Sequence, residues 1–388
     1  MNKIAVITMT RAEYGLILPV LRELRKNENE DFRAELVVGG THLNKAYGMT
    51  VNEIIADGVR IDQRIDAPVN SDTEQDIANN ISRYIESFTA LFIRERYTAV
   101  LILGDRYEML AVAIAAGITR TPVFHLCGGD TTEGAIDEWI RHSITKIASI
   151  HFVTNEISRK RVIQLGEAPD RVFNYGSTSL DNIMSITIMS KEEALQSIDL
   201  GGCEYALCTW QPVTAESADA AEQIEILLKV IKSFPDITFI VTKANADYQG
   251  NIINRLFDDA QKTIPNMVLH ASLGVKRYIS LMRHCSFVLG NSSSGIVEAP
   301  ACGVPTVNIG DRQKGRLKAQ SIVDCDMQYE EICNAIVKVR SDDYRKICFN
   351  EANPYGNGDA GEKIAAKCME IITNGKIELK KSFYDCGV

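Results

Sequence analysis

Residues 100–146 place the tightest limits on what this chain can fold into. Two short, apolar runs rich in β-branched residues mark it, 99–103 at its start and 122–126 within it, and each is followed by a polar turn and then a helical pattern. Unbroken apolar runs of this length are typical of parallel strands that helices cover on both faces. Because the carboxyl ends of such strands meet at one side of a sheet, where ligands bind, we expect Asp105, Arg106 and Asp130 to lie at an active site.

The same alternation of strand and helix runs through the whole chain and predicts an α/β fold of doubly wound parallel sheets. It restarts after a mixed, acidic segment at residues 191–204, and in this interpretation its last strand is at residues 306–309. A chain of 388 residues is also too long for one ordinary core. We therefore expect two Rossmann-like domains with a cleft between them, where binding sites are favoured. The expected bounds are 1–185, 186–360 and, for a C-terminal helix and tail that pack on the first domain, 361–388.

Composition excludes several classes of protein. The chain has 45% hydrophobic and 24% charged residues, which is typical of a soluble globular protein. Its net charge of −9 argues against a nucleic-acid-binding surface, and no apolar run approaches the ~18 residues of a membrane helix. The N-terminus lacks the pattern of a signal peptide, and the ten Cys form no CxxC pair. We therefore expect a cytoplasmic protein with reduced thiols.

The first loop and the histidines argue against a dinucleotide site and a metal site. The loop has a single glycine, Gly15, and so does not form the GxGxxG turn of a dinucleotide site. Arg11, where this loop meets the first helix, is placed either for a phosphate or as a surface residue. The six His are dispersed without the spacing of metal ligands. Asp105 could bind Mg²⁺ with a diphosphate, but Arg106 beside it already supplies positive charge, so we expect no metal and no cofactor.

A second polar stretch, residues 290–295, follows a buried strand and opens a helix with three consecutive serines. Backbone N–H groups and hydroxyls at such a helix start, here those of Ser292 and Ser293, can contact phosphate oxygens. Glu298, one turn further on, could accept both hydroxyls of a ribose, and Arg312 could pair with a phosphate. Serine caps many helices for structural reasons alone. The combination with Glu298 and Arg312 nevertheless favours a nucleotide site.

Together these motifs resemble the hydrolysing branch of the UDP-N-acetylglucosamine 2-epimerase family, which serves the synthesis of sialic-acid-type sugars. The resemblance implies the GT-B architecture, with residues 1–185 on the sugar and catalytic side and 186–360 binding UDP. It also implies a homodimer or homotetramer. The matching segments span nearly the whole chain in the family's order: TRAEYG (10–15), GTHLNKAYG (40–48), LGDRYE (103–108), GGDTTEGAIDEWIRHSITK (128–146), RVIQLGE (161–167), GNSSSGIVEAP (290–300) and NIGDRQKGR (308–316).

The resemblance implies a reaction in two steps. Anti elimination of UDP from UDP-N-acetylglucosamine gives a 2-acetamidoglucal, and addition of water then gives N-acetylmannosamine. The proton on carbon 2 is poorly acidic, so loss of the diphosphate must drive the first step. Carboxylates near the ring can stabilise the developing cation and remove the proton, while arginines neutralise the departing UDP.

Other functions remain open on the sequence. The nearest is the same chemistry on UDP-2,4-diacetamido-2,4,6-trideoxyglucose, in a legionaminic-acid-type pathway. A GT-B glycosyltransferase would share the fold and the UDP site, but it requires fewer acidic residues than Asp105, Asp130 and Asp137. A non-hydrolysing epimerase fits the GDR and IRHSITK segments less well. The last alternative is a nucleotide-binding protein without activity.

By resemblance, Asp105 and Asp137 match the family's catalytic acidic positions, and Arg106 is the GDR arginine beside the substrate. Arg141 lies one helical turn after Asp137, where it can hold that carboxylate ionised. His142 is interpreted as a structural helix residue. The positions that match the UDP-binding set, with Tyr278 beside the uracil, are Arg11, Tyr278, Ser292, Ser293, Glu298 and Arg312.

Two positions depart from the family. Where many members have HIEGGE, residues 125–130 read HLCGGD, so Cys127 replaces a glutamate often assigned as the catalytic base. We assign the missing role to Asp130 and interpret Cys127 as a small neutral core residue, with a thiol base as the alternative. In the second domain, Gln211 replaces the histidine of the family's HP.T turn. A glutamine can hydrogen-bond a diphosphate or a hydroxyl but cannot transfer a proton near neutral pH.

Overall fold

The computed structural model describes residues 1–66, 73–132, 136–212, 220–244, 250–350, 352–375 and 377–386. The chain forms two compact units: unit 1 is Met1–Asp130, Asp137–Asn182 and Tyr355–Val388, and unit 2 is Thr131–Ile136 and Ile183–Pro354. The crossings at 182/183 and 354/355 lie three and six residues before the expected boundaries at 185/186 and 360/361. The segment Thr131–Ile136 groups with unit 2 although its neighbours on both sides belong to unit 1, which the sequence did not predict.

The described part of unit 1 is built on one parallel seven-stranded sheet with the order β3-β2-β1-β4-β5-β6-β7. The chain runs outward from β1 to β3 and then returns to β4 beside β1. Strand order therefore reverses between β1 and β4, the position at which ligands bind in open α/β sheets. The strands are β1 (Asn2–Thr8), β2 (Phe32–Gly39), β3 (Gln63–Ile65), β4 (Ala99–Leu103), β5 (Val123–Leu126), β6 (Ile150–Val153) and β7 (Val172–Asn174).

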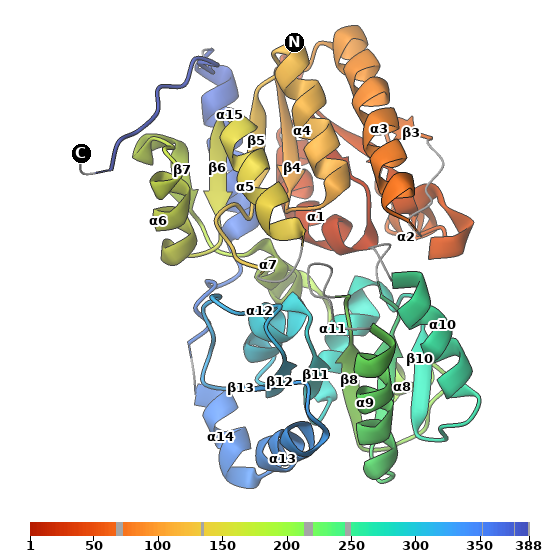
Figure 1. Cartoon of the computed structure of the whole chain (residues 1–388). Coiled ribbons are helices and arrows are strands. Elements are labelled where there is room, and N and C mark those ends of the chain that lie inside the picture. The colour runs from red at the N-terminus through yellow and green to blue at the C-terminus, as the bar shows by residue number, and fades with distance from the viewer. Residues whose placement is uncertain are drawn as a thin grey trace. The chain divides into compact units, whose positions relative to one another are not determined.

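Helices cover both faces of this sheet (Figure 1). On one face α3 (Glu74–Glu95), α4 (Tyr107–Thr119) and α5 (Asp137–Ile147) pack side by side, and on the other α1 (Arg11–Lys26) packs against α15 (Ala360–Thr373). The apolar runs of β4 and β5 are buried throughout because both faces are covered. The remaining elements of unit 1 are α2 (Val51–Ala56), α6 (Glu156–Gln164) and the 3-10 turns Gly40–Leu43, Lys45–Tyr47 and Pro169–Arg171. The boundary at 182/183 falls within α7 (Thr178–Ser185).

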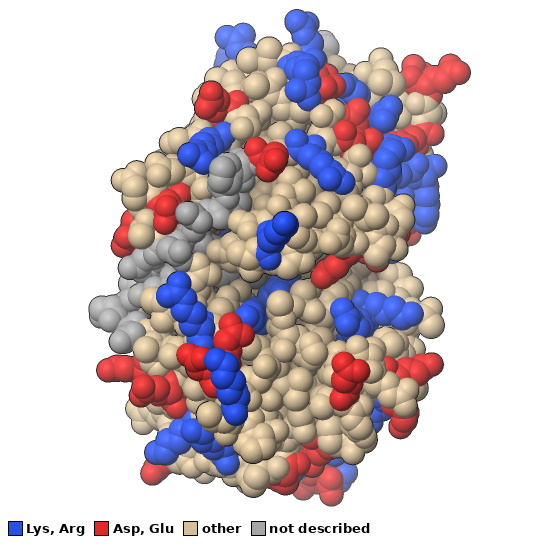
Figure 2. Space-filling view, turned by 90° about the vertical axis from the view of Figure 1, so that its right-hand side faces the viewer, with Lys and Arg blue, Asp and Glu red and all other residues tan. Residues whose placement is uncertain are grey.

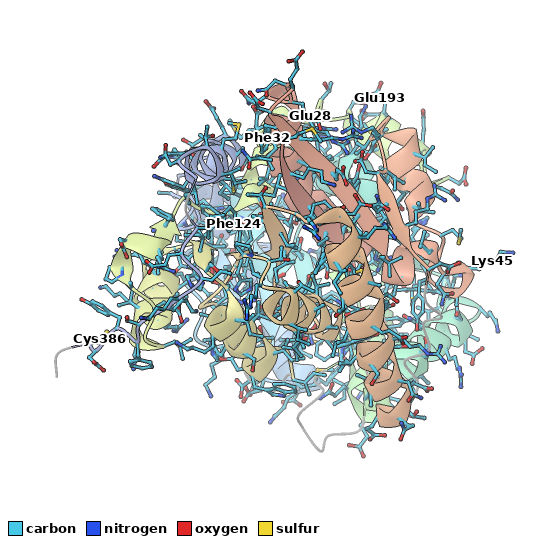
Figure 3. All side chains as sticks on the ribbon, turned by 90° about the horizontal axis from the view of Figure 1, so that it is seen from above. Glu28, Phe32, Lys45, Phe124, Glu193 and Cys386 are labelled. Carbon is cyan, nitrogen blue, oxygen red and sulfur yellow. The ribbon has the colours of Figure 1, made fainter. Side chains whose placement is uncertain are left out.

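The core of unit 1 follows from this layering. Seen from above, Phe124 of β5 lies among the strands and helices, whereas Lys45 and Cys386 lie at the rim (Figure 3). The C-terminal helix α15 docks closely because Gly361 has no side chain: a Cβ there would lie 2.8 Å from Cβ of Pro19 in α1. The backbone N–H of Gly361 donates to the Asp181 carboxylate at 2.7 Å. The start of α15 is thus fixed in unit 1 by its packing against α1 and by the hydrogen bond to Asp181.

The described part of unit 2 holds a second parallel sheet, with the order β10-β9-β8-β11-β12-β13. Its strands are β8 (Tyr205–Thr209), β9 (Thr238–Thr242), β10 (Met267–His270), β11 (Val288–Gly290), β12 (Thr306–Ile309) and β13 (Ile322–Cys325). Its helices are α8 (Lys191–Gln196), α9 (Ala220–Ser233), α10 (Gly250–Gln261), α11 (Gly274–His284), α12 (Ser293–Ala301), α13 (Tyr329–Val339) and α14 (Asp342–Asn350).

Our expectation that the second series ends at residues 306–309 was wrong, because β13, α13 and α14 follow that strand. β13 pairs with β12 at the edge of the sheet, and all four of its residues are partly or fully exposed. A short strand of this kind lacks the unbroken apolar run that marks a buried strand in a sequence.

Acidic and basic side chains are interspersed on the face that Figure 2 shows, without one continuous basic surface. In the part of the chain that the structure describes, no helix combines the length and the apolar character needed to cross a bilayer.

Candidate active site

The turn after β4 carries Asp105 and is fixed by a neighbouring strand. Gly104 adopts a φ of 84°, which favours glycine, and its carbonyl accepts a hydrogen bond from Nε2 of His125 in β5 at 2.7 Å. His125 is fully buried, and burial lowers the pKa of its ring to about 3. The ring is therefore neutral near pH 7, with its proton on Nε2, and it fixes the backbone before Asp105.

Arg141 joins the acidic residues that follow β4 and β5. Its side chain, 1% exposed, donates from Nη1 to the carbonyl of Asp130 at 2.7 Å and to Oε2 of Glu138 at 3.1 Å. Nη2 donates to the carboxylate of Asp105, whose side chain is 26% exposed. One buried guanidinium thus links two turns that lie at adjacent strand ends, and it leaves Asp105 accessible.

Asp130 is held mainly through one carboxylate oxygen. Oδ1 accepts hydrogen bonds from the hydroxyls of Thr154 at 2.9 Å and Ser158 at 2.6 Å. The preceding residue, Gly129, has a φ of 79°, and a Cβ there would come within 2.2 Å of the Ser158 carbonyl oxygen. Only glycine permits this approach, which brings Asp130 against the start of α6.

Asp137 is the first residue of α5, where the helix dipole favours a negative charge. The sequence prediction that Asp137 pairs with Arg141 stays a prediction. The contacts described above join Arg141 to Asp105, Glu138 and the carbonyl of Asp130. Glu138 also contacts Nε2 of His142 at 3.2 Å. Glu138 was missed, although its spacing from Arg141 and His142 on one helix is a signal that could have found it.

Arg106, predicted to lie beside the substrate, is 7% exposed. It donates from Nε to Oε2 of Glu108 at 3.2 Å and from Nη2 to Oε1 at 3.4 Å. Glu13, also buried, accepts from the backbone N–H groups of Met9 and Thr10 at 2.7 and 3.1 Å. Burial, followed by the charge of Glu108, raises the pKa of Glu13 to about 8.

Arg11 begins α1 directly after the backbone that Glu13 holds. The sequence prediction missed Glu13 and Glu108. The three-residue spacing of Thr10 and Glu13, a capping box, was the available signal for Glu13.

Cys127 has an unusual backbone conformation for its residue type. Its φ of 64° lies in the left-handed region, which costs a residue with a Cβ roughly 1–2 kcal/mol. The thiol is partly buried and its backbone N–H donates to the carbonyl of Phe152 at 2.9 Å. Cys127 therefore occupies a tight turn directly before the two glycines that lead to Asp130.

Unit 2 organises its polar groups around Asn291, which the sequence prediction did not single out. Asn291 is fully buried; its side chain accepts from the backbone N–H of Gln211 at 2.7 Å and donates to the Gln211 carbonyl at 2.8 Å. The Asn291 carbonyl accepts from Nη1 of Arg312 at 3.2 Å and from Gln313 at 2.9 Å. Gln211 and Arg312, at the ends of different strands, are thereby brought together.

The serines open α12, with Ser292 as its N-cap and Ser293 as its first residue. Ser294, missed by the sequence prediction, donates from Oγ to Oε2 of Glu298 at 2.5 Å and contacts the hydroxyl of Tyr278 at 2.9 Å. Burial raises the pKa of Glu298 to about 7, while the hydrogen bond from Ser294 opposes that change. Ser294 thus contacts both Glu298 and Tyr278, the two residues predicted to bind the ribose and the base.

Among the residues that the structure describes, no group of three or more His, Cys, Asp or Glu side chains is arranged so that it could hold a metal ion. Each unit therefore has its own candidate groups: carboxylates and arginines in unit 1, and hydroxyls, amides and Glu298 in unit 2.

Comparison with known proteins identifies the family. The model of the UDP-N-acetylglucosamine 2-epimerase family matches residues 23–369. The chain belongs to this family. The GDP/UDP-N,N'-diacetylbacillosamine 2-epimerase (hydrolyzing) of Campylobacter jejuni is 36% identical, with 99% of each chain covered. Polysialic acid biosynthesis protein P7 of Escherichia coli is 34% identical, covering 99% of this chain and 98% of the relative.

Two further members extend the comparison. The UDP-N,N'-diacetylbacillosamine 2-epimerase (hydrolyzing) of Legionella pneumophila is 32% identical, covering 96% of this chain and 95% of the relative. The crystal structure of the UDP-GlcNAc 2-epimerase of Neisseria meningitidis bound to UDP-GlcNAc superposes with a TM-score of 0.80 at 19% identity, covering 95% of this chain and 100% of that one. The prediction of two Rossmann-like, parallel-sheet domains of the GT-B kind is confirmed.

Proposed function

We propose that this epimerase-family protein is a hydrolysing 2-epimerase of a UDP-linked N-acetylated amino sugar. In the first step the bond from carbon 1 to UDP breaks as a base removes the proton on carbon 2, giving the 2-acetamidoglycal and UDP. In the second step water adds to carbon 1. A proton adds to carbon 2 from the face opposite to the one from which the first proton was removed, which inverts carbon 2. The observation that carries the proposal is the linkage of Asp105 and the Asp130 turn by the buried Arg141.

The residues of unit 1 suit the proton transfers. The reaction needs one base and then one acid near carbon 2, and carboxylates in different surroundings can divide these roles. Asp105 is partly exposed and paired with an arginine, whereas Asp130 is 6% exposed and bonded to two hydroxyls. We assign the proton transfers to Asp105, Asp130 and Asp137, with Arg141 fixing their geometry. Because Arg106 is buried against Glu108, we assign it to positioning the turn after β4.

The residues of unit 2 suit the nucleotide. Serine hydroxyls and N–H groups at the start of α12 are suited to phosphate oxygens, and Glu298 to the ribose hydroxyls. We assign to UDP the unit 2 residues Gln211, Tyr278, Ser292, Ser293, Glu298 and Arg312, together with Arg11 of unit 1.

Two sugars are the candidates for the substrate. Two relatives that are 36% and 32% identical are named as diacetylbacillosamine 2-epimerases, and bacillosamine is the 2,4-diamino-2,4,6-trideoxy sugar considered above. We therefore favour the UDP-linked diacetamido sugar over UDP-N-acetylglucosamine, which the sequence had placed first. Both share the acetamido group on carbon 2 and the UDP group on carbon 1, which are the groups that the reaction uses.

The experiment is to incubate the protein with each UDP-sugar in deuterated water, without added divalent metal, and to follow both by NMR. We expect free manno-configured sugar with deuterium at carbon 2, formed faster from the diacetamido compound. An Asp137→Asn variant should lose turnover and still bind UDP. Intact UDP-sugar without exchange for either compound would reject the proposal, and turnover that a chelator abolishes and Mg²⁺ restores would reject its metal-free form.

A further inference from the structure

The chain between Asp130 and Asp137 starts with two threonines that are bound by a loop of unit 2. Oγ1 of Thr131 donates to the carbonyl of Lys314 at 2.9 Å. Arg316 donates from Nε to the carbonyl of Thr131 at 2.8 Å and from Nη2 to the hydroxyl of Thr132 at 3.4 Å. Thr131 and Thr132 are 9% and 1% exposed, so these bonds form largely away from water, where they hold geometry well.

Asp130, the residue directly before this pair, is held equally firmly within unit 1. Its carbonyl accepts from Arg141, and its carboxylate accepts from Thr154 and Ser158. The peptide group that joins Asp130 to Thr131 is planar, so a displacement of Thr131 turns the Asp130 carbonyl that Arg141 binds. Arg316 and Arg141 thus fix two consecutive carbonyl groups of one turn.

The loop that carries Arg316 also carries Arg312 and Gln313. Both of these donate to the carbonyl of Asn291, directly before the serines of α12. One short loop therefore contacts the start of the proposed UDP site at one end and the residue after Asp130 at the other.

From these contacts we infer that Arg316 is a positioning residue for the proton transfers. It sets the orientation of Asp130 through the carbonyl of Thr131, without touching the substrate. The inference rests on the proposed function. An arginine suits the task because its planar guanidinium addresses a carbonyl and a hydroxyl at once, which the single ammonium of lysine does less well.

The test is to measure kcat, KM and the Kd for UDP in Arg316→Ala and Arg316→Lys, with the sugar that the wild type turns over. A displacement of the order of 1 Å at a reacting group can cost about 10²-fold in rate. We expect kcat to fall by about that factor in Arg316→Ala while KM and the Kd for UDP change only a few-fold. Arg316→Lys keeps one donor for the Thr131 carbonyl and should recover part of kcat.

Two further variants make the result specific. Lys318→Ala removes a nearby cation that pairs with Asp324, at 2.8 Å, and should leave all three constants unchanged. Thr131→Val removes the bond to Lys314 from the other side and should also lower kcat, so it carries the test if Arg316→Ala does not fold in a thermal melt.

Unchanged kcat in folded Arg316→Ala, or a loss that appears in the Kd for UDP instead, would overturn the positioning role alone. Failure of the wild type to turn over either sugar would overturn the proposed function, and the role of Arg316 with it.

Discussion

The two units satisfy the polar groups at the carboxyl ends of their sheets in different ways. Unit 1 relies on charged pairs. Arg141 binds the carboxylates of Asp105 and Glu138, and Arg106 binds that of Glu108. Both arginines are buried, so each pair is fixed by its surroundings as well as by its charges.

Unit 2 relies mainly on neutral groups at the same position. The side chain of Asn291 pairs with the backbone of Gln211, and Ser294 contacts both Tyr278 and Glu298. The carboxyl of Glu298 has a pKa near 7 and so is only partly ionised at neutral pH.

This difference separates two tasks. Charges that are already oriented act strongly on charge that develops in a transition state, because they need no reorganisation when the reaction occurs. Hydroxyls, amides and free N–H groups suit an anion that the ligand itself brings. We therefore expect the loss of the Asp105 charge in unit 1 to lower turnover, and the loss of the Glu298 charge in unit 2 to weaken binding.

The largest effect is expected for Asp105→Asn. Asparagine keeps an oxygen that can accept from Arg141, so the fold should be retained, but the group can no longer take or give a proton. Loss of a general acid or base typically costs about 10²–10⁴-fold, and we expect a fall in kcat of this order. The Kd for UDP should stay within a few-fold of the wild type. Calorimetry with UDP and turnover by NMR measure the two quantities.

Asp31→Asn, at an exposed residue between α1 and β2, provides the matched control. A variant Asp105→Asn that binds UDP weakly but turns over bound substrate at the normal rate would reverse the assignment of tasks to the two units.

The fold was largely predictable because most strands of both sheets are buried on two faces. Strands Ala99–Leu103 and Thr306–Ile309 have the bounds expected from the sequence. The edge strand Ile322–Cys325 was missed because its residues are partly exposed and carry no such run. A strand buried on both faces needs a run of apolar residues that can be recognised in the sequence, whereas an exposed edge strand does not.

The sequence indicated where the residues of the site lie in the chain, but not which residues they contact. The ends of strands drew attention to Asp105 and Asp130, but the pairing of Asp105 with Arg141 depends on how two βα units pack. Nothing local in the sequence indicates that Thr131 belongs to unit 2, because its bonds are to Lys314 and Arg316, about 180 residues away. Such contacts follow from tertiary structure alone.

A smaller, pH-dependent effect is expected in unit 2 for Glu298→Gln. The ordinary pKa of glutamate is 4.5, and burial raises that of Glu298 to about 7. Ribose hydroxyls that donate to the carboxylate favour its ionised form, so UDP binding should release a proton and tighten as the pH rises toward 7. A hydrogen bond to a charged group contributes about 1.5–3 kcal/mol, so at pH 8 the variant should bind UDP roughly 10- to 100-fold more weakly.

Below pH 6 the difference between wild type and Glu298→Gln should shrink to a few-fold, because the wild-type carboxyl is then largely protonated. The titration of UDP itself affects both proteins equally and cancels in the comparison. Glu330→Gln, at an exposed glutamate in the first turn of α13, should match the wild type at every pH. Parallel pH profiles for wild type and Glu298→Gln would remove Glu298 from the ribose contact.

The smallest effect is expected for substitution of Cys127. This experiment tests whether carboxylates alone carry out the proton transfers in unit 1. If Asp130 has the role of the family's glutamate, Cys127→Ala and Cys127→Gly should both keep kcat within a few-fold of the wild type. Glycine should give the more stable variant, by about 1 kcal/mol, because both variants lose the thiol but only alanine keeps a Cβ at a φ of 64°. Denaturant unfolding measures this difference.

A fall in kcat of about 10²-fold or more in Cys127→Ala would make the thiol the base, since that is the loss expected for a proton-transfer group. The charged pairs around Arg141 would then serve to position a thiolate, and Asp130 would serve only to bind the start of α6.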